Sequence, residues 1–227
     1  MSVTVSQIKQ VLIDNEVEYL YHANTVATSI SFLLKGGLLS RGAVEELNYT
    51  QTPQKTDDLD KRLGVYFDIF FDSDDIHARA KDLNSYGPVT FVYSINILDT
   101  LKDKVVKITK DNPIRWSETT PEEERYFTEL IPMQFEYQKG AFRQHLLICD
   151  MHEPLSFNPY LVKIIIDNPN IDNTTYFDNA VNAIQTILEK KGINAPLEVR
   201  ECPADCKCKQ KYKKFKEGFT YYKFKVR

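Results

Sequence analysis

Three short segments set polar or aromatic side chains inside strand-like apolar runs, and these side chains have the types that do chemistry. The segments are Tyr21–Asn24, Gly64–Phe67 and Phe142–Ile148. A neutral histidine, such as His22 or His145, can accept a hydrogen bond and can act as a base near neutral pH. Taken singly, such residues are more often ordinary members of a buried sheet. The chemical interpretation therefore depends on the three segments acting together.

The elements that must position these segments alternate between helices and strands. Apolar periodicity predicts helices at 6–15, 24–35, 73–83, 121–130 and 174–191. Strand-like runs occupy 17–22, 64–71, 89–97, 101–108, 142–149, 161–166 and 196–199. Gly36 and Gly192 follow two of the helices, as expected for glycines that end them. The polar stretch 42–61 is expected to be a loop with one helical turn near 44–47.

Composition indicates one ordinary globular domain. The chain has 227 residues, 42% of them hydrophobic, and a net charge of −3 that gives no general attraction to nucleic acid or anionic membranes. No apolar stretch reaches the roughly 20 residues of a membrane-spanning helix. The N-terminus lacks the basic start and apolar region of a signal peptide. We therefore expect a cytoplasmic protein without a membrane partner.

Read in order, the segments 19–41, 62–95 and 142–167 resemble the signature of the ADP-ribosyltransferase superfamily. They contain a strand histidine followed by a helix and a glycine stop, then Gly-aliphatic-Tyr-Phe, then a late strand ending at an aspartate. The helix 174–191 followed by 192–199 resembles the end of DarT-type toxins. The resemblance implies an α+β fold of split β-sheets with flanking helices. It covers residues 1–200, and 201–227 form an extension of the same domain, rich in cysteine, lysine and aromatic residues.

The resemblance also implies NAD as a co-substrate and assigns roles around it. His22 would hydrogen-bond a ribose hydroxyl, and Tyr66 would stack on the nicotinamide ring. Arg41 and Arg62 are candidates for the pyrophosphate, because a guanidinium fork matches phosphate geometry. Ser40 and Tyr93 would make lesser contacts.

The third segment departs from the family, which usually carries a glutamate there. Counting back from the end of the strand, that position falls on His145, or on Gln144 if the register shifts by one. Because strand side chains alternate, only one of these neighbours can face the site. His145 could act as a base, whereas Gln144 could only bind sugar hydroxyls. A larger shift would instead bring Glu136 or Glu153 into the site, so catalytic activity stays open.

These observations leave three hypotheses for function. The first is a DarT-like, NAD-dependent ADP-ribosyltransferase, with DNA or RNA as the acceptor and an antitoxin as a partner. The second is an inactive module of the same fold that binds NAD, ADP-ribose or nucleic acid. The third is an enzyme that transfers an RNA 2′-phosphate to NAD, although the chain lacks the basic charge expected for it.

The cysteines and the C-terminal residues need separate interpretations. Cys149 lies in an apolar run and is expected to be a buried thiol. Cys202, Cys206 and Cys208 offer three thiolates, but no histidine follows them, so we expect no metal. The basic, aromatic tail could bind single-stranded nucleic acid, but an edge strand with protective lysines is favoured.

Overall fold

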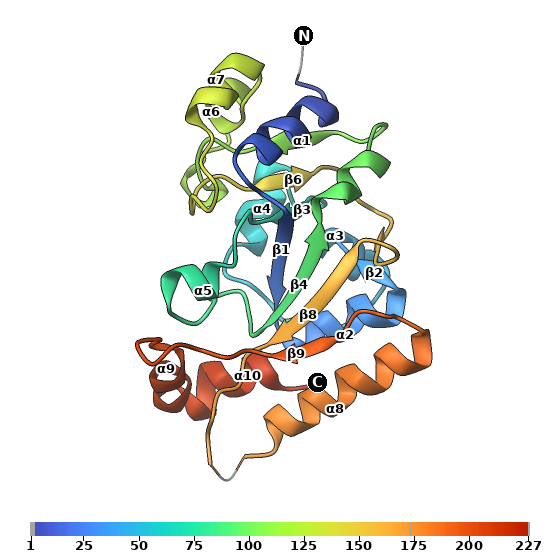
Figure 1. The fold of residues 1–227 in the computed structure, drawn as a ribbon, viewed down its shortest axis with the longest axis vertical. Helices are drawn as coiled ribbons and strands as arrows, with labels where there is room; N and C mark the ends of the chain where they lie inside the picture. Colours follow the sequence, from blue (N-terminus) through green and yellow to red (C-terminus); the bar gives the residue numbers. More distant parts are fainter. Residues whose placement is uncertain (1–2, 173, 227) are drawn as a thin grey trace.

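The computed structural model describes residues 3–172 and 174–226, and its central element is a four-stranded sheet (Figure 1). The strand order is β1-β4-β8-β9, formed by β1 (Tyr19–Asn24), β4 (Val89–Ser94), β8 (Leu161–Ile166) and β9 (Leu197–Val199). The first three strands pair antiparallel, and β9 runs parallel to β8. β4 is buried at all but its last residue, which explains its continuous apolar sequence.

Two smaller sheets complete the strand content of the described residues. One has the order β3-β6-β5, formed by β3 (Ile69–Phe71), β6 (Leu146–Ile148) and β5 (Val106–Ile108). The other pairs β2 (Gly37–Leu38) with β7 (Leu155–Ser156). The backbones of Tyr21 and Asp72 exchange two hydrogen bonds of 2.9 Å, which joins β1 to the residue after β3. The predicted α+β fold of split sheets with flanking helices is therefore confirmed.

Local signals in the sequence account for the helix ends. The hydroxyl of Thr25 accepts a hydrogen bond from the backbone of Thr28 at the start of α2, and Gly36 ends that helix in a left-handed conformation (φ 86°). Gly192 ends α8 in the same way. The α-helices are α1 (Val5–Asp14), α2 (Val26–Lys35), α3 (Arg41–Glu46), α4 (Asp57–Leu63), α5 (Ile76–Ala80), α6 (Glu122–Arg125), α7 (Leu130–Glu136), α8 (Tyr176–Lys191), α9 (Cys208–Lys214) and α10 (Tyr221–Phe224). Short 3-10 helices cover Ile95–Thr100 and Pro113–Arg115, and a π-helical turn covers Lys216–Thr220.

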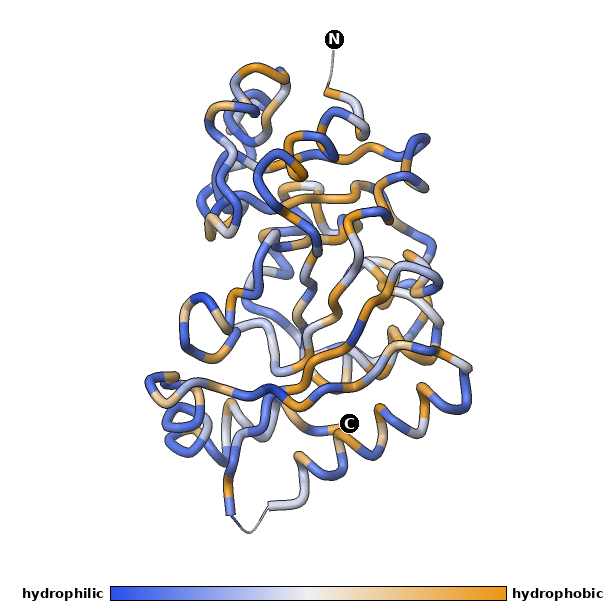
Figure 2. Tube along the Cα trace, in the orientation of Figure 1, coloured by the Kyte–Doolittle hydropathy of each residue, from blue (hydrophilic) through white to orange (hydrophobic). Residues whose placement is uncertain are grey.

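The core lies between the central sheet and the helices that cover it. Phe32 of α2 packs edge-on against Phe91 of β4, with ring centroids 5.9 Å apart, and α8 packs against α2. Figure 2 shows α8 alternating between hydrophilic and hydrophobic residues, as expected for a helix with one face on the core. Among the described residues, no helix has the length and apolar character needed to cross a membrane.

The stretch 42–61 differs from its prediction as a loop, because it contains most of two helices. The hydroxyl of Ser40 caps α3 by accepting a hydrogen bond from the backbone of Ala43. α4 begins with three aspartates in its first turn and ends at Gly64, which has a φ of 74°. Because that helix and a turn occupy residues up to 68, β3 is shorter than the predicted strand 64–71.

The C-terminal residues also differ from the favoured edge strand, because they form helices. Cys208 and Tyr212 lie one turn apart on α9, and both are buried. The ring of Tyr212 meets that of Phe224 at 5.5 Å, edge-on. Both aromatics belong to the hydrophobic core that includes Phe32, so this extension packs with the rest of the described chain.

Candidate functional site

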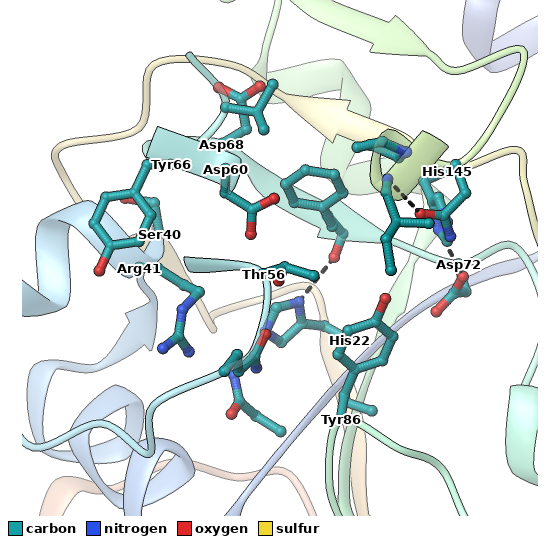
Figure 3. Close-up of a pocket in the computed structure, with 18 of the residues that line it drawn as sticks. His22, Ser40, Arg41, Thr56, Asp60, Tyr66, Asp68, Asp72, Tyr86 and His145 are labelled. Carbon is teal, nitrogen blue, oxygen red and sulfur yellow. Dashed lines mark hydrogen bonds and ion pairs between the residues drawn. The ribbon is translucent and has the colours of Figure 1, made fainter. Parts of the chain in front are cut away.

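A cleft opens between β1 and the segments that follow β3 and α3 (Figure 3). It brings together side chains from all three segments that the sequence analysis singled out. The lining residues are Tyr21, His22, Ala23, Asn24, Leu39, Ser40, Arg41, Gln54, Thr56, Asp60, Val65, Tyr66, Asp68, Phe70, Asp72, Tyr86, Asn112, Pro113, Ile114 and His145. The backbone bridge between Tyr21 and Asp72 holds the two sheets together at this point.

His22 is half-buried in the cleft, and one of its ring nitrogens is a buried hydrogen-bond acceptor. Its Nδ1 lies 2.8 Å from the carbonyl oxygen of Phe70, so Nδ1 carries the proton and donates it there. Burial lowers the pKa of His22, mainly because the charged form would lose its hydration. Its Nε2 has no hydrogen-bond partner among the described residues. The lone pair of Nε2 can therefore accept a hydrogen bond from a hydroxyl group of a ligand.

Arg41 supplies a second buried polar atom that has no partner among the described residues. It is the first residue of α3, where the Ser40 hydroxyl fixes the backbone and donates a 2.7 Å hydrogen bond to the carbonyl of Met151. The guanidinium pairs with the carboxylate of Asp57 and donates to the carbonyl of Thr52 at 3.1 Å. Its Nη1 has no partner among the described residues. A fixed guanidinium with one unused nitrogen is suited to an anionic oxygen.

Tyr66 contributes an aromatic ring, and its hydroxyl group is already hydrogen-bonded within the protein. The hydroxyl donates a 2.7 Å hydrogen bond to Glu45, and Lys61 lies 4.5 Å from the ring centroid. Burial, followed by the bond to Glu45, raises the pKa of Tyr66, so the hydroxyl stays protonated. The residue also lines the cleft.

His145, just before β6, lies between an acid and an amide. Its Nδ1 is 2.9 Å from the carboxylate of Asp72, and its Nε2 is 3.1 Å from Nδ2 of Asn112. With the proton on Nδ1, Nε2 accepts a hydrogen bond from Asn112. Thr109 holds the backbone on both sides of the residue, at 2.9 Å. This histidine is oriented by a carboxylate, as in bases that must keep one tautomer.

Sequence reasoning missed the carboxylates of the cleft, which are Asp60, Asp68 and Asp72. Burial raises the pKa of Asp68 to about 6, despite a 3.0 Å hydrogen bond from the backbone of Asp150. Burial also raises the pKa of Asp60. Asp72 directly follows the apolar run of β3, and this position at the end of a strand was the one signal in the sequence that could have indicated it. Together these acids favour positive charge in the cleft.

Three residues assigned to the site from sequence do not line this cleft. Gln144 turns the other way and bonds the backbone of Glu136 and Gln138 at 3.0 and 2.7 Å. Its neighbour His145 faces the cleft, as strand alternation requires. Arg62 lies on the exposed side of α4, 3.6 Å from Glu118.

Tyr93 is the third of these residues, and it lies in the core. Its side chain is fully buried on β4, where the hydroxyl donates to the carbonyl of Leu155 at 3.3 Å. The core covers this side chain, so it does not reach the cleft. Glu136 and Glu153, which a larger register shift would have introduced, are also absent from the cleft lining.

Comparisons with known proteins find similarity in structure but not in sequence. No known protein family and no curated protein matches the chain. The structure of Thermus sp. 2.9 DarT in complex with ADP-ribosylated ssDNA matches with a TM-score of 0.50 at 11% identity, covering 82% of this chain and 95% of that chain. Complexes of Thermus sp. 2.9 DarT with NAD+ and with carba-NAD+ give TM-scores of 0.48 and 0.45 at 12% identity, covering 82% of this chain and 96% of those chains. The chain thus has a DarT-like ADP-ribosyltransferase fold.

Proposed function

We propose that this chain is an NAD-dependent ADP-ribosyltransferase of the DarT-like kind. The observation that carries the proposal is the convergence of His22, Arg41, Tyr66 and His145 in one cleft of this fold. Two of them have a buried polar atom without a partner among the described residues, Nε2 of His22 and Nη1 of Arg41. Buried polar atoms are nearly always paired in proteins, so a ligand is the natural partner for these two.

NAD would fill the cleft with its ribose beside β1. A ribose hydroxyl would donate to Nε2 of His22, and a pyrophosphate oxygen would accept from Nη1 of Arg41. The ring of Tyr66 would stack on the nicotinamide. Ser40 acts indirectly, because its hydroxyl is already bonded to the backbone at both ends and holds Arg41 in position.

Cleavage of the bond between nicotinamide and ribose builds positive charge on the sugar, and the carboxylates of the cleft would stabilise that charge. Asp72 takes part of the role that the family gives to a glutamate, acting through His145. The imidazole Nε2 would leave Asn112 and accept a proton from the attacking group of the acceptor. Asp72, 2.9 Å from Nδ1, would stabilise the imidazolium that forms.

The acceptor that we propose is nucleic acid. The support is the likeness in fold to Thermus sp. 2.9 DarT, whose structure was solved with ADP-ribosylated ssDNA. Incubation with NAD and either single-stranded DNA or RNA decides which of the two is the acceptor. We further propose that the enzyme acts in the cytoplasm and is paired with an antitoxin, as expected for a toxin of this kind.

An inactive module that binds NAD or ADP-ribose is the second candidate function. It is favoured by two observations: the described residues that line the cleft include no glutamate, and His145 is bonded on both ring nitrogens. Transfer of an RNA 2′-phosphate is disfavoured, because Arg41 is the one arginine among the lining residues.

The deciding experiment incubates the protein with NAD, alone and with single-stranded DNA or RNA, and measures released nicotinamide and labelled nucleic acid. Transfer to one nucleic acid supports the proposal and names the acceptor. Binding of NAD by calorimetry without release supports the inactive module instead. If the folded protein binds neither NAD nor ADP-ribose, both functions are excluded. His152→Ala, at an exposed histidine outside the cleft lining, is the matched control for His22→Ala.

A further inference from the structure

A second cluster of reactive side chains lies outside the cleft, between α5 and the start of α9. Its members are His77 of α5 and Cys202, Cys206 and Cys208, and we call it the Cys–His cluster. One ligand atom from each residue lies within 4.8 Å of all the others. His77 precedes Cys202 by 125 residues, so the spacing of the cysteines alone could not reveal it. The fold thus provides the fourth ligand whose absence led us to expect no metal.

The distances within the Cys–His cluster suit a tetrahedral metal ion. Nε2 of His77 lies 3.5 Å from Sγ of Cys202 and 3.5 Å from Sγ of Cys206. The Sγ atoms of Cys202 and Cys208 are also 3.5 Å apart. Bond lengths of about 2.3 Å to sulfur and 2.0 Å to nitrogen place tetrahedral ligand atoms roughly 3.5 Å apart for an N–S pair and 3.8 Å for an S–S pair.

The other ring nitrogen of His77 is held by a carboxylate, as in many zinc sites. Nδ1 lies 2.8 Å from Oδ2 of Asp167, so it donates its proton there and leaves the lone pair of Nε2 facing the sulfurs. A carboxylate that fixes the tautomer of a ligand histidine and increases its basicity is a common outer-shell feature of metal sites. Asp167 directly follows β8 and is almost fully buried, so water does not compete for its carboxylate oxygens.

A network of buried groups fixes the outer shell. Asp167 also accepts hydrogen bonds of 2.6 Å from Nε of Arg200 and from the hydroxyl of Tyr212. Arg200 bonds Asp75 at 2.5 Å, and Asp75 caps α5 by accepting from the backbone of His77. The same network therefore positions the helix that carries the histidine and the segment that carries the cysteines. Such preorganisation is what a metal site requires.

The structure assigns the Cys–His cluster as a structural zinc site, with three thiolates and one imidazole as ligands. Four protein ligands leave no open position, which distinguishes a structural zinc from a catalytic one. Soft thiolates with an imidazole in tetrahedral geometry select zinc over magnesium or calcium. Each thiol would release its proton as the ion binds. The zinc would fasten α9 and the helices that follow it to α5, which lies above α9 at the left of Figure 1.

A disulfide is a poorer explanation of the same cysteines. The Cys202 and Cys208 sulfurs are 3.5 Å apart, well beyond the roughly 2.05 Å of a disulfide bond. Joining any two of the three would also leave the third thiol unpaired within 4.8 Å of a ring nitrogen of His77. A count of free thiols in denatured, chelator-treated protein that was prepared without a reductant distinguishes the two chemistries, because a disulfide removes two of the four thiols and a zinc site removes none.

The test uses the full chain, purified under reducing conditions from zinc-supplemented cells, and needs no NAD. Elemental analysis should find about one zinc per chain, and a strong chelator should lower the melting temperature. Cobalt exchanged for zinc should give the thiolate charge-transfer absorption of a tetrahedral Co²⁺ site. Wild-type protein with no stoichiometric metal and no such cobalt spectrum would overturn the assignment.

Variants then test each ligand against a matched residue. Cys208→Ser and His77→Ala should lose the zinc, whereas Cys149→Ser and His152→Ala should retain it, because neither Cys149 nor His152 belongs to the cluster. Full zinc retention by His77→Ala would contradict the assignment of the histidine. Where a variant fails to fold, the metal content and the cobalt spectrum of the wild type still decide.

Discussion

The buried carboxyl of Asp68 should lower the stability of this protein at neutral pH. Burial raises its pKa from 3.8 to about 6. Between these values the folded state holds a proton that the unfolded state has lost, so stability falls as the pH rises through this window. The shift is about two pKa units, and each unit corresponds to about 1.36 kcal/mol. Above pH 6 the ionised carboxylate therefore costs at most about 3 kcal/mol of unfolding free energy.

Asp68→Asn removes that charge and keeps an oxygen that can accept from the backbone of Asp150. The variant should be more stable than the wild type at pH 8 by about 1 to 3 kcal/mol, a fraction of the upper limit, since the amide is also a buried polar group. In a chain of 227 residues this raises the melting temperature by roughly 2–4 °C per kcal/mol. The gain should shrink as the pH is lowered through this window and should vanish only below pH 3.8, where the carboxyl is protonated in both the folded and the unfolded state.

Thermal unfolding of the wild type and of Asp68→Asn is measured in parallel at pH 4.5, 6 and 8. The contributions of other titrating groups then cancel in the difference between the two melting temperatures. An equal change in melting temperature at all three pH values, or a loss of stability at pH 8, would refute the argument from burial. If the carboxylate also stabilises a sugar cation, the same variant should release nicotinamide more slowly. Opposite effects on stability and activity are expected where a buried charge destabilises the fold but takes part in the reaction.

Three further predictions concern the cleft and the strand beside it. His22→Ala should weaken NAD binding by about 1–3 kcal/mol, or roughly 5- to 150-fold by calorimetry, because a ligand hydroxyl loses its buried acceptor. His145→Ala and His145→Glu should both change the rate of nicotinamide release, whereas Gln144→Ala should not; a dependence on Gln144 alone would mean that the other side chain faces the sugar. Gly87→Ala would place a Cβ 2.1 Å from backbone atoms of the strand that carries His22. The free energy of unfolding, measured with denaturant, should fall by about 1–3 kcal/mol. The control Gly218→Ala, whose Cβ would have no atom within 4 Å, should lose little stability.

Much of the local structure could be predicted from sequence, because it depends on neighbours along the chain. The 3.6-residue periodicity of α8 and the glycines that end α2 and α8 are local signals, and those helices end at Lys191 and Lys35 as expected. The β4 and β8 runs were also evident from their apolar residues. By contrast, the C-terminal helices were not predicted, because alternating lysines and aromatics suit a strand or a helix until burial decides.

The candidate site also combines residues that the sequence indicated with features that the sequence could not reveal. Residue type and order indicated His22, Arg41, Tyr66 and His145, all of which line one cleft. Their order along the chain follows from the fold that the sequence resembles. Tyr93 lies in the core instead of the cleft, and alternation along a strand does not reveal whether a sheet face is open or covered.

Only the tertiary structure revealed the partners of these residues. Asp72 meets His145 across 73 positions of sequence, and His77 meets Cys202 across 125. Neither pairing leaves a trace in spacing, because the chain between the partners folds into separate elements whose packing brings them together. The sequence determined which groups can do chemistry and which local elements carry them. Packing of distant elements decided which groups share a site, since hydrogen bonding and ligation depend on distances of a few ångströms in space.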